Sequence, residues 1–178
     1  MNLLIKGADL IGAGRQDVLI NDGVITEIGT LDPHAKTIDQ TIDADGLIAL
    51  PGLVDLHTHL REPGREDAET NASGSAAAAI GGFTAILAMA NTTPATDTAE
   101  AAERVLDLGR LAGLVDVQPV GSVTKGLDGE ELAELGLMAH SRAHVRVFSD
   151  DGRCVHDAAL MLRALEQVKA FGGVVSQH

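Results

Sequence analysis

The first 50 residues show the alternating apolar and polar pattern of short β-strands. Two runs rich in Val and Ile lie on either side of Asn21-Asp22-Gly23 in "DVLINDGVITEIG". A polar, Gly-containing pair between such runs favours a tight β-hairpin. A further short run, in "TIDADGLIALPG", ends at Pro51-Gly52. The pattern predicts a small β-rich domain over residues 1–50.

After Pro51, apolar strand-like runs alternate with helical stretches. Five runs predict strands: "GLVDLHTHL", "FTAILAMAN", "VDVQPVGSV", "HVRVFSDD" and "GGVVSQH". Helices are predicted over residues 98–112, with Asp97 as N-cap and Gly113 as the stop, and in "EELAELGLMAH" and "DAALMLRALEQVKAF". Continuous apolar strands between helices indicate an α/β fold with a parallel sheet covered by helices.

The number of predicted strands favours the front part of a larger barrel over residues 51–178. A closed barrel of parallel strands and helices needs eight strands. The last predicted strand ends at His178 with no helix to cover it. We therefore expect a truncated barrel from a longer protein, and an open five-stranded sheet is the alternative.

Composition narrows the classes of partner. Apolar residues make up 45% of the 178 residues and aromatic residues only 2%, so the core must consist of aliphatic side chains. The net charge of −13 argues against nucleic acid and anionic membranes as partners. No apolar run is long enough to cross a bilayer. The single cysteine is typical of a reducing cytoplasm, where we expect the protein.

Ionisable residues occupy every second position of the first predicted barrel strand, "LPGLVDLHTHLREPG". Alternate side chains of a strand point to opposite faces, so Asp55, His57, His59 and Arg61 are expected to share one face. The two histidine Cα atoms would lie about 6.6 Å apart, at roughly 3.3 Å per residue. Two imidazoles so placed can bind one metal ion. Ordinary hydrogen-bonded core histidines are the alternative.

Further ligand-type residues follow other predicted strands. The carboxyl ends of parallel strands meet at one edge of the sheet, where sites are built. Asn91 ends the second predicted strand, Asp150-Asp151 the fourth and His178 the fifth. A carboxylate and another imidazole from this edge would complete a metal site. In the alternative, Asp-Asp-Gly is only a turn, and Asn91 only shapes the turn before Pro94.

Other polar side chains are expected to have no role in a site. Arg61 and Glu62 could form a surface ion pair, and the run "REPGREDAE" is expected to be a solvated loop. Cys154 is expected to be a structural thiol. The remaining histidines are expected to be non-functional: His34, His140, His144 and His156.

Four motifs together resemble a known family. "PGLVDLHTHLREPG" closely resembles the signature of the cyclic amidohydrolases, and its "HLREPG" resembles the dihydroorotases. "MANTTP" is similar to the second-strand motif of that family, which usually reads Met-Pro-Asn-Thr; here Ala90 replaces the Pro and Asn91 is kept. "FSDDG" and "SQH" resemble the bacterial long-chain type. The resemblance spans essentially the whole chain.

The resemblance implies a fold and a metal centre. The fold would be the front part of an amidohydrolase-type TIM barrel after a small β-sandwich-like segment. One or two zinc ions would be bound. His57 and His59 would bind the more buried ion, Asp151 would bridge the two, and His178 would bind the second.

The resemblance also implies the reaction. It is the reversible, zinc-dependent cyclisation of N-carbamoyl-L-aspartate to L-dihydroorotate, a step of pyrimidine biosynthesis. His59, Arg61 and Asn91 would contact the substrate, and the Arg61 fork suits its carboxylate. The full-length protein would be a homo-oligomer, with aspartate transcarbamoylase as a candidate partner. The family's proton-transferring Asp would lie beyond His178, so the 178 residues alone are expected to be inactive.

Two alternatives of different kinds are weaker. Hydantoinases, dihydropyrimidinases and allantoinases carry a carboxylated Lys at the fourth strand, whereas this chain has "VRVFSDDG" there. Arg61 argues further against the first two, whose substrates lack such a carboxylate. A non-catalytic, dihydroorotase-like scaffold that binds aspartate transcarbamoylase would be expected to lack metal ligands, and this chain retains four.

Overall fold

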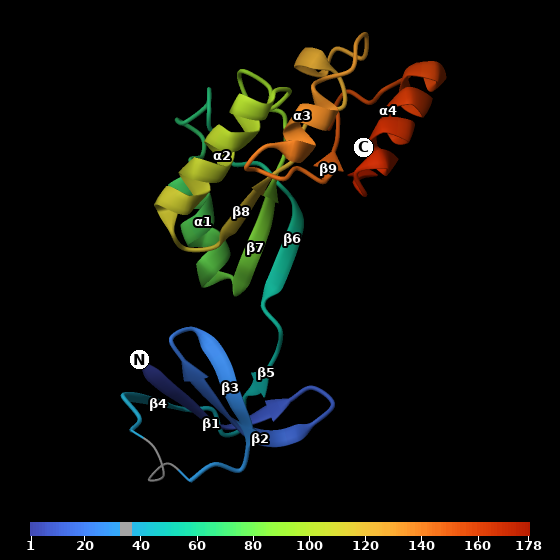
Figure 1. Cartoon of the computed structure of the whole chain (residues 1–178). Helices are drawn as coiled ribbons and strands as arrows, with labels where there is room; N and C mark the ends of the chain where they lie inside the picture. The colour runs from blue at the N-terminus through green and yellow to red at the C-terminus, as the bar shows by residue number, and fades with distance from the viewer. Residues whose placement is uncertain (33–36) are drawn as a thin grey trace. The chain divides into compact units, whose positions relative to one another are not determined.

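The chain folds into two compact units, Met1–Pro51 and Gly52–His178 (Figure 1). The computed structural model describes residues 1–32 and 37–178. His34, one of the histidines expected to be non-functional, lies outside the described residues. No helix in the described part of the chain has the length and apolar character needed to cross a membrane.

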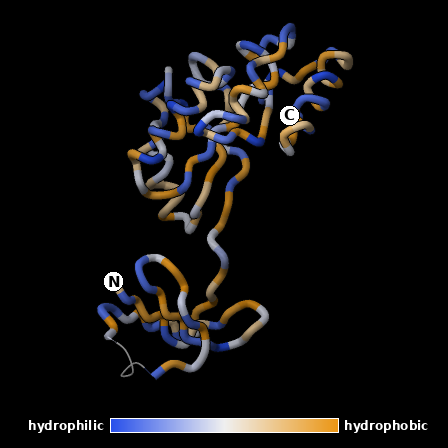
Figure 2. The backbone as a smooth tube through the Cα atoms, in the orientation of Figure 1, coloured by the Kyte–Doolittle hydropathy of each residue, from blue (hydrophilic) through white to orange (hydrophobic). Residues whose placement is uncertain are grey.

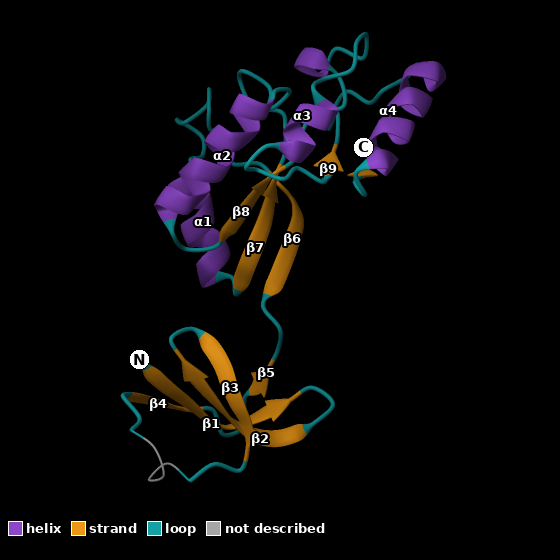
Figure 3. Cartoon of the chain, viewed as in Figure 1, coloured by secondary structure: helices purple, strands orange, loops and turns teal. Residues whose placement is uncertain are grey.

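The first unit is a five-stranded sheet, drawn as strands in Figure 3. The strands are β1 (Asn2–Leu10), β2 (Gly14–Asn21), β3 (Val24–Gly29), β4 (Gln40–Asp43) and β5 (Ile48–Ala49). β1, β2 and β3 pair antiparallel, whereas β4 and β5 both run parallel to β1. The hairpin turn is Asp22-Gly23, with φ of 47° and 81°, the positive values that a tight two-residue turn needs. The predicted hairpin and β-rich start are confirmed.

The second unit contains the predicted parallel strands. β6 (Leu53–Thr58), β7 (Phe83–Ala88) and β8 (Asp116–Pro119) form one parallel sheet in that order. β9 (Val147–Phe148) and β10 (Val174–Val175) form a second parallel pair, and a bridge from Gly121 to Phe148 joins β9 to the end of β8. All five predicted strands are present, although each is shorter than its apolar run.

Four helices follow the strands (Figure 1). They are α1 (Asn71–Ile80), α2 (Ala99–Ala112), α3 (Leu135–His140) and α4 (Ala158–Ala170), with a short 3-10 turn at Lys125–Leu127. α2 and α4 match two of the predicted helices, whereas α3 begins at Leu135 and not at Glu130, where its predicted run begins. α1 was not predicted, because its run of Ala, Ser and Gly has little contrast between faces. Its sequence signal is the pair Thr70 and Ser73, which cap its first turn reciprocally.

The predicted N-cap of α2 is wrong by one residue. Thr98, not Asp97, caps the helix, and its hydroxyl accepts a hydrogen bond from the Ala101 amide. The Asp97 carboxylate instead accepts a hydrogen bond from the Gly126 amide, at 2.9 Å. Asp97 thus contacts a distant loop, and Thr98 caps the helix. The predicted stop is confirmed, since Gly113 ends α2 in the left-handed conformation, with φ of 66°.

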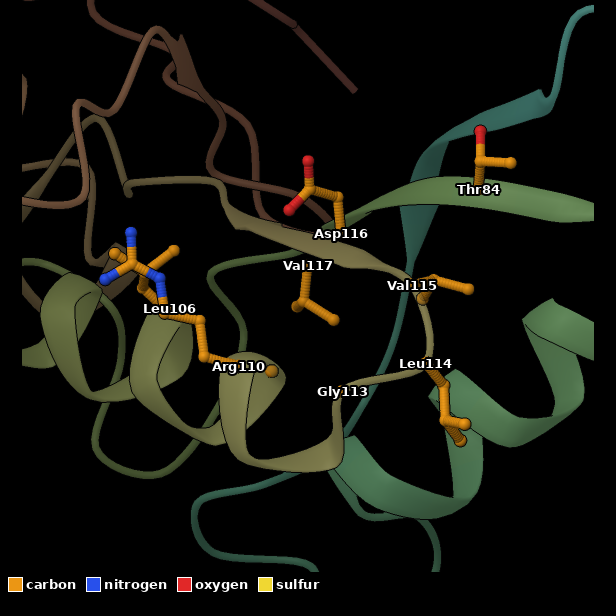
Figure 4. Close-up of a pocket in the computed structure, with 9 residues that line it drawn as sticks. Thr84, Leu106, Arg110, Gly113, Leu114, Val115, Asp116 and Val117 are labelled. Carbon is orange, nitrogen blue, oxygen red and sulfur yellow. The ribbon is translucent and has the colours of Figure 1, made fainter. Parts of the chain in front are cut away.

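The core of the second unit consists mostly of aliphatic residues, together with the fully buried Phe148 and Met138. Apolar residues recur along its strands (Figure 2), and Ile86, Val105 and Val117 are buried between β7, β8 and α2. Figure 4 shows Val117 directed from β8 toward α2. The groove in Figure 4 includes Gly113 and Thr84, at the amino ends of the strands, away from the edge where a site was predicted.

Close packing of α2 on β8 depends on Gly109. A Cβ at this position would lie 2.4 Å from the Val117 Cβ. We expect Gly109→Ala to lower the free energy of unfolding by about 1–2 kcal/mol, because overpacking outweighs the gain in helix propensity. Urea denaturation measures this change. The matched control is Gly136→Ala in α3, where a Cβ meets nothing within 4 Å; equal stability of the two variants would contradict the packing argument.

Candidate metal centre

His57 lies in the irregular last part of β6, and His59 lies directly after this strand. The pairing of β6 with β7 shifts register between Asp55, which pairs with Ile86, and Thr58, which pairs with Ala88. An advance of three residues along β6 therefore corresponds to an advance of two residues along β7. Such a β-bulge interrupts the alternation of faces. β6 then ends at Thr58, before His59 and Arg61. The prediction of one continuous strand through Arg61 is therefore wrong, whereas the expected convergence of His57 and His59 is found.

The structure nevertheless brings three imidazoles to one carboxylate. Asp151 follows β9 and is buried. Its Oδ2 atom lies 3.4 Å from His57 Nε2 and 3.5 Å from His59 Nε2. Its Oδ1 atom lies 2.6 Å from Nδ1 of His178, which follows β10. The carboxyl ends of three strands therefore place their ligand-type atoms around Asp151.

The spacing around Asp151 Oδ2 fits a divalent metal ion. The ligand atoms of His57, His59 and Asp151 all lie within 4.8 Å of one another. Two donors that each lie about 2.1 Å from a tetrahedral ion are about 3.4 Å apart. The two distances from the histidines to Oδ2 match that separation. Imidazole and carboxylate donors suit zinc and other divalent transition metals.

His178 approaches the other oxygen of the same carboxylate. Its 2.6 Å distance to Oδ1 is that of a short hydrogen bond. The two oxygens of Asp151 thus face different partners, two histidines on one side and one on the other. This is the division that a carboxylate shared between two ions would need. Cys154 also contacts His178: the Cys154 thiol donates a hydrogen bond to the His178 carbonyl oxygen at 2.6 Å.

Asn91, at the end of the neighbouring strand, contacts two members of the cluster. Its Oδ1 atom lies 3.0 Å from His59 Nδ1, and its amide nitrogen donates to Asp151 Oδ2 at 2.8 Å. An Nδ1–H that donates to Asn91 leaves the Nε2 lone pair of His59 free on the side of Asp151. The sequence had indicated only a contact between Asn91 and substrate. The structure adds an orienting contact to a candidate ligand.

The two adjacent aspartates have separate roles in the structure. Asp150 is buried, and its Oδ1 atom accepts hydrogen bonds from the amides of Val123 and Thr124 at 2.7 and 3.1 Å. Its other oxygen accepts from the Thr124 hydroxyl. Asp150 therefore ties the segment after β8 to the end of β9. Asp151 is the one that faces the histidines.

Arg61 follows β6 and is only partly buried. Its guanidinium has no hydrogen bond or ion pair with any side chain in the described part of the chain, so the alternative of an ion pair with Glu62 is not realised. The metal-ligand group found among the described residues consists of His57, His59 and Asp151. The histidines at positions 140, 144, 156 and 178 are not members of it, and His178 joins the cluster only through its contact with Asp151 Oδ1.

Comparison with known proteins gives relatives over the whole chain. The family model described as dihydro-orotase-like matches residues 46–178. The dihydroorotase of Leifsonia xyli subsp. xyli is 60% identical over 176 residues, which cover 98% of this chain and 40% of that protein. The dihydroorotase of Mycobacterium tuberculosis is 54% identical over 179 residues, which cover 100% of this chain and 41% of that protein. The chain thus spans about 40% of the length of these curated relatives.

A solved structure with the same fold supports the architecture. The L-hydantoinase (dihydropyrimidinase) from Arthrobacter aurescens superposes with a TM-score of 0.79 at 24% identity, over 99% of this chain and 40% of that one. At this identity the likeness concerns the fold, and it confirms the predicted front part of an amidohydrolase-type barrel after a β-rich segment. The family model spans all the barrel strands and every member of the cluster around Asp151. The chain therefore belongs to the dihydro-orotase-like family of the amidohydrolase superfamily.

Proposed function

We propose that the protein is a metal-dependent dihydroorotase, which cyclises N-carbamoyl-L-aspartate reversibly to L-dihydroorotate in pyrimidine biosynthesis. The observation that carries the proposal is the convergence of His57, His59 and His178 on the two oxygens of buried Asp151. The 60% identity to a curated dihydroorotase supports the choice of reaction within the superfamily.

We assign the metal ligands to His57, His59, Asp151 and His178, and the metal to zinc. Bound zinc would lower the pKa of a water molecule and polarise the carbonyl group of the ring amide. Asp151 Oδ2 would serve the site of His57 and His59, and Oδ1 that of His178, which favours two ions over one. Asn91 would hold the His59 ring in the tautomer that can ligate.

We assign the substrate carboxylate to Arg61, with His59 and Asn91 as further contacts. Both the open and the closed form of the substrate carry this carboxylate, and a guanidinium binds two carboxylate oxygens at once. The unpaired state of Arg61 supports this role. The proton-transferring group is not assigned to any residue of this chain, because the resemblance places it on an Asp beyond His178.

The setting of the reaction is proposed from the resemblance. A cytoplasmic homo-oligomer would suit an enzyme of this family, and aspartate transcarbamoylase is a candidate partner. The substrate is a small anion, in keeping with the prediction that neither nucleic acid nor membrane is a partner. The second candidate reaction is that of a hydantoinase, favoured only by the shared fold at 24% identity. Its ring substrates lack the carboxylate that Arg61 would bind.

Arg61→Lys in the full-length protein, of the length that the relatives have, tests the proposal. We expect the KM for dihydroorotate to rise about 10–100-fold, because an ammonium cannot replace a charged two-point contact. Zinc content should stay unchanged. Steady-state ring opening and metal analysis measure the two quantities.

The control for this substitution is Arg65→Lys. Arg65 lies in the same loop but forms an exposed ion pair with Asp67. Wild-type kinetics for Arg61→Lys would contradict the carboxylate assignment. Dihydrouracil is a ring substrate without the carboxylate. If the wild type hydrolysed dihydrouracil faster than dihydroorotate, the hydantoinase reaction would be favoured instead.

A further inference from the structure

Arg61 occupies a backbone conformation that side chains rarely adopt. Its φ is 59°, in the left-handed region. The Glu62 amide donates a hydrogen bond to the Leu60 carbonyl oxygen at 2.7 Å, which closes a γ-turn centred on Arg61. Such a turn with positive φ at a non-Gly residue is strained, and it persists only where the surrounding structure holds it.

The next residue is held to the start of α1. Glu62 Oε2 accepts hydrogen bonds from the Asn71 backbone amide at 2.8 Å and from the Asn71 side-chain amide at 3.2 Å. Asn71 is the first residue of α1 and only 1% exposed. Its side-chain oxygen has no donor among the described residues, and the hydrogen bonds of its side-chain nitrogen go to Glu62. We call this pair the Glu62–Asn71 anchor.

The Glu62–Asn71 anchor also affects the electrostatic surroundings of Arg61. Glu62 is the carboxylate adjacent to Arg61 in the chain, and a free Glu62 could pair with the guanidinium. With its carboxylate engaged by Asn71, Glu62 forms no ion pair with Arg61 in the described structure. The anchor therefore keeps the Arg61 guanidinium available for an anion from outside the chain.

We propose that Glu62 and Asn71 are positioning residues that set the substrate affinity of Arg61. The anchor holds Arg61 in its left-handed turn and withholds the neighbouring carboxylate, so that the guanidinium is preorganised for the carboxylate of the ring substrate. This inference rests on the proposed function, because it assumes that Arg61 binds that carboxylate.

The test is Glu62→Ala in the full-length, zinc-loaded protein. Misplacement of a binding group by about 1 Å can cost about 100-fold, so the KM for dihydroorotate should rise about 10–100-fold. kcat and zinc content should change little. Glu62→Gln keeps an acceptor for the Asn71 amide and should remain closer to the wild type than Glu62→Ala. The control is Asp67→Asn, which removes the same charge from an exposed ion pair of the same loop.

A double-mutant comparison separates positioning of Arg61 from a general structural role. In an Arg61→Ala background, Glu62→Ala should have no further effect on KM, since residues that act through one another are not additive. An equal loss in both backgrounds, or a parallel loss of zinc, would overturn the inference. Where Glu62→Ala does not fold, Asn71→Ala replaces it, because that variant keeps the backbone contact to Glu62.

The same variants distinguish failure of the anchor from failure of the proposed function. A wild-type KM for Arg61→Ala would overturn the carboxylate assignment itself, and the anchor's role with it. A large effect of Arg61→Ala with no effect of Glu62→Ala or Asn71→Ala would overturn the anchor alone.

Discussion

His57→Ala in the full-length protein is expected to abolish tight zinc binding and to reduce dihydroorotate hydrolysis by about 1,000-fold or more, since a metal ion supplies several kcal/mol of transition-state stabilisation. The physical reason is the loss of one of the two imidazoles that lie 3.4 and 3.5 Å from Asp151 Oδ2. Metal content after dialysis against a weak chelator and initial rates of ring opening measure the two effects.

A graded series makes this result specific. Asn91→Ala keeps every candidate ligand but removes the contacts to His59 Nδ1 and Asp151 Oδ2, so zinc affinity should fall only about 10–100-fold. His156→Ala removes an exposed histidine outside the cluster and should leave both quantities unchanged. Stoichiometric zinc and full activity in His57→Ala would refute the proposed metal centre.

Residues 1–178 produced alone are expected to show no dihydroorotase activity and to be poorly soluble or loosely packed. On β6, the side chains of Leu53, Val54 and Leu56 are 45%, 53% and 67% exposed. β6 is an edge strand, and exposed apolar side chains on an edge strand favour association. The chain also covers only about 40% of the relatives' length, and its proton-transferring group is unassigned.

The test of this second prediction compares residues 1–178 with the full-length protein. Size-exclusion chromatography, urea unfolding, zinc titration and the ring-opening assay are applied to both. Weak zinc binding is still expected, because His57 and His59 come from one short segment. A monomeric, cooperatively unfolding and active product would show that these residues build a site by other means.

Local chemistry explains which elements could be predicted from sequence. Asp22-Gly23 specifies its turn because only a few residue types adopt two successive positive φ values. α2 and α4 have apolar residues at helical spacing, and their faces are visible in the sequence. α1 packs through small residues instead, so its amphipathic signal is weak. The sequence offered no sign that Asp97 would accept a hydrogen bond from Gly126, 29 residues away, while Thr98 caps α2.

The sequence by itself determined which residues are candidate ligands and in which order they occur. It also indicated that they would lie near one another, because the carboxyl ends of successive parallel strands meet at one edge. Only the tertiary structure decided how they face one another. The bulge in β6 breaks the expected alternation, and neighbouring strands assign Asp150 to backbone amides and Asp151 to the histidines. The turn at Arg61 likewise depends on a contact between Glu62 and α1. Spacing along a chain fixes directions only within one regular element, whereas these choices arise from contacts between elements.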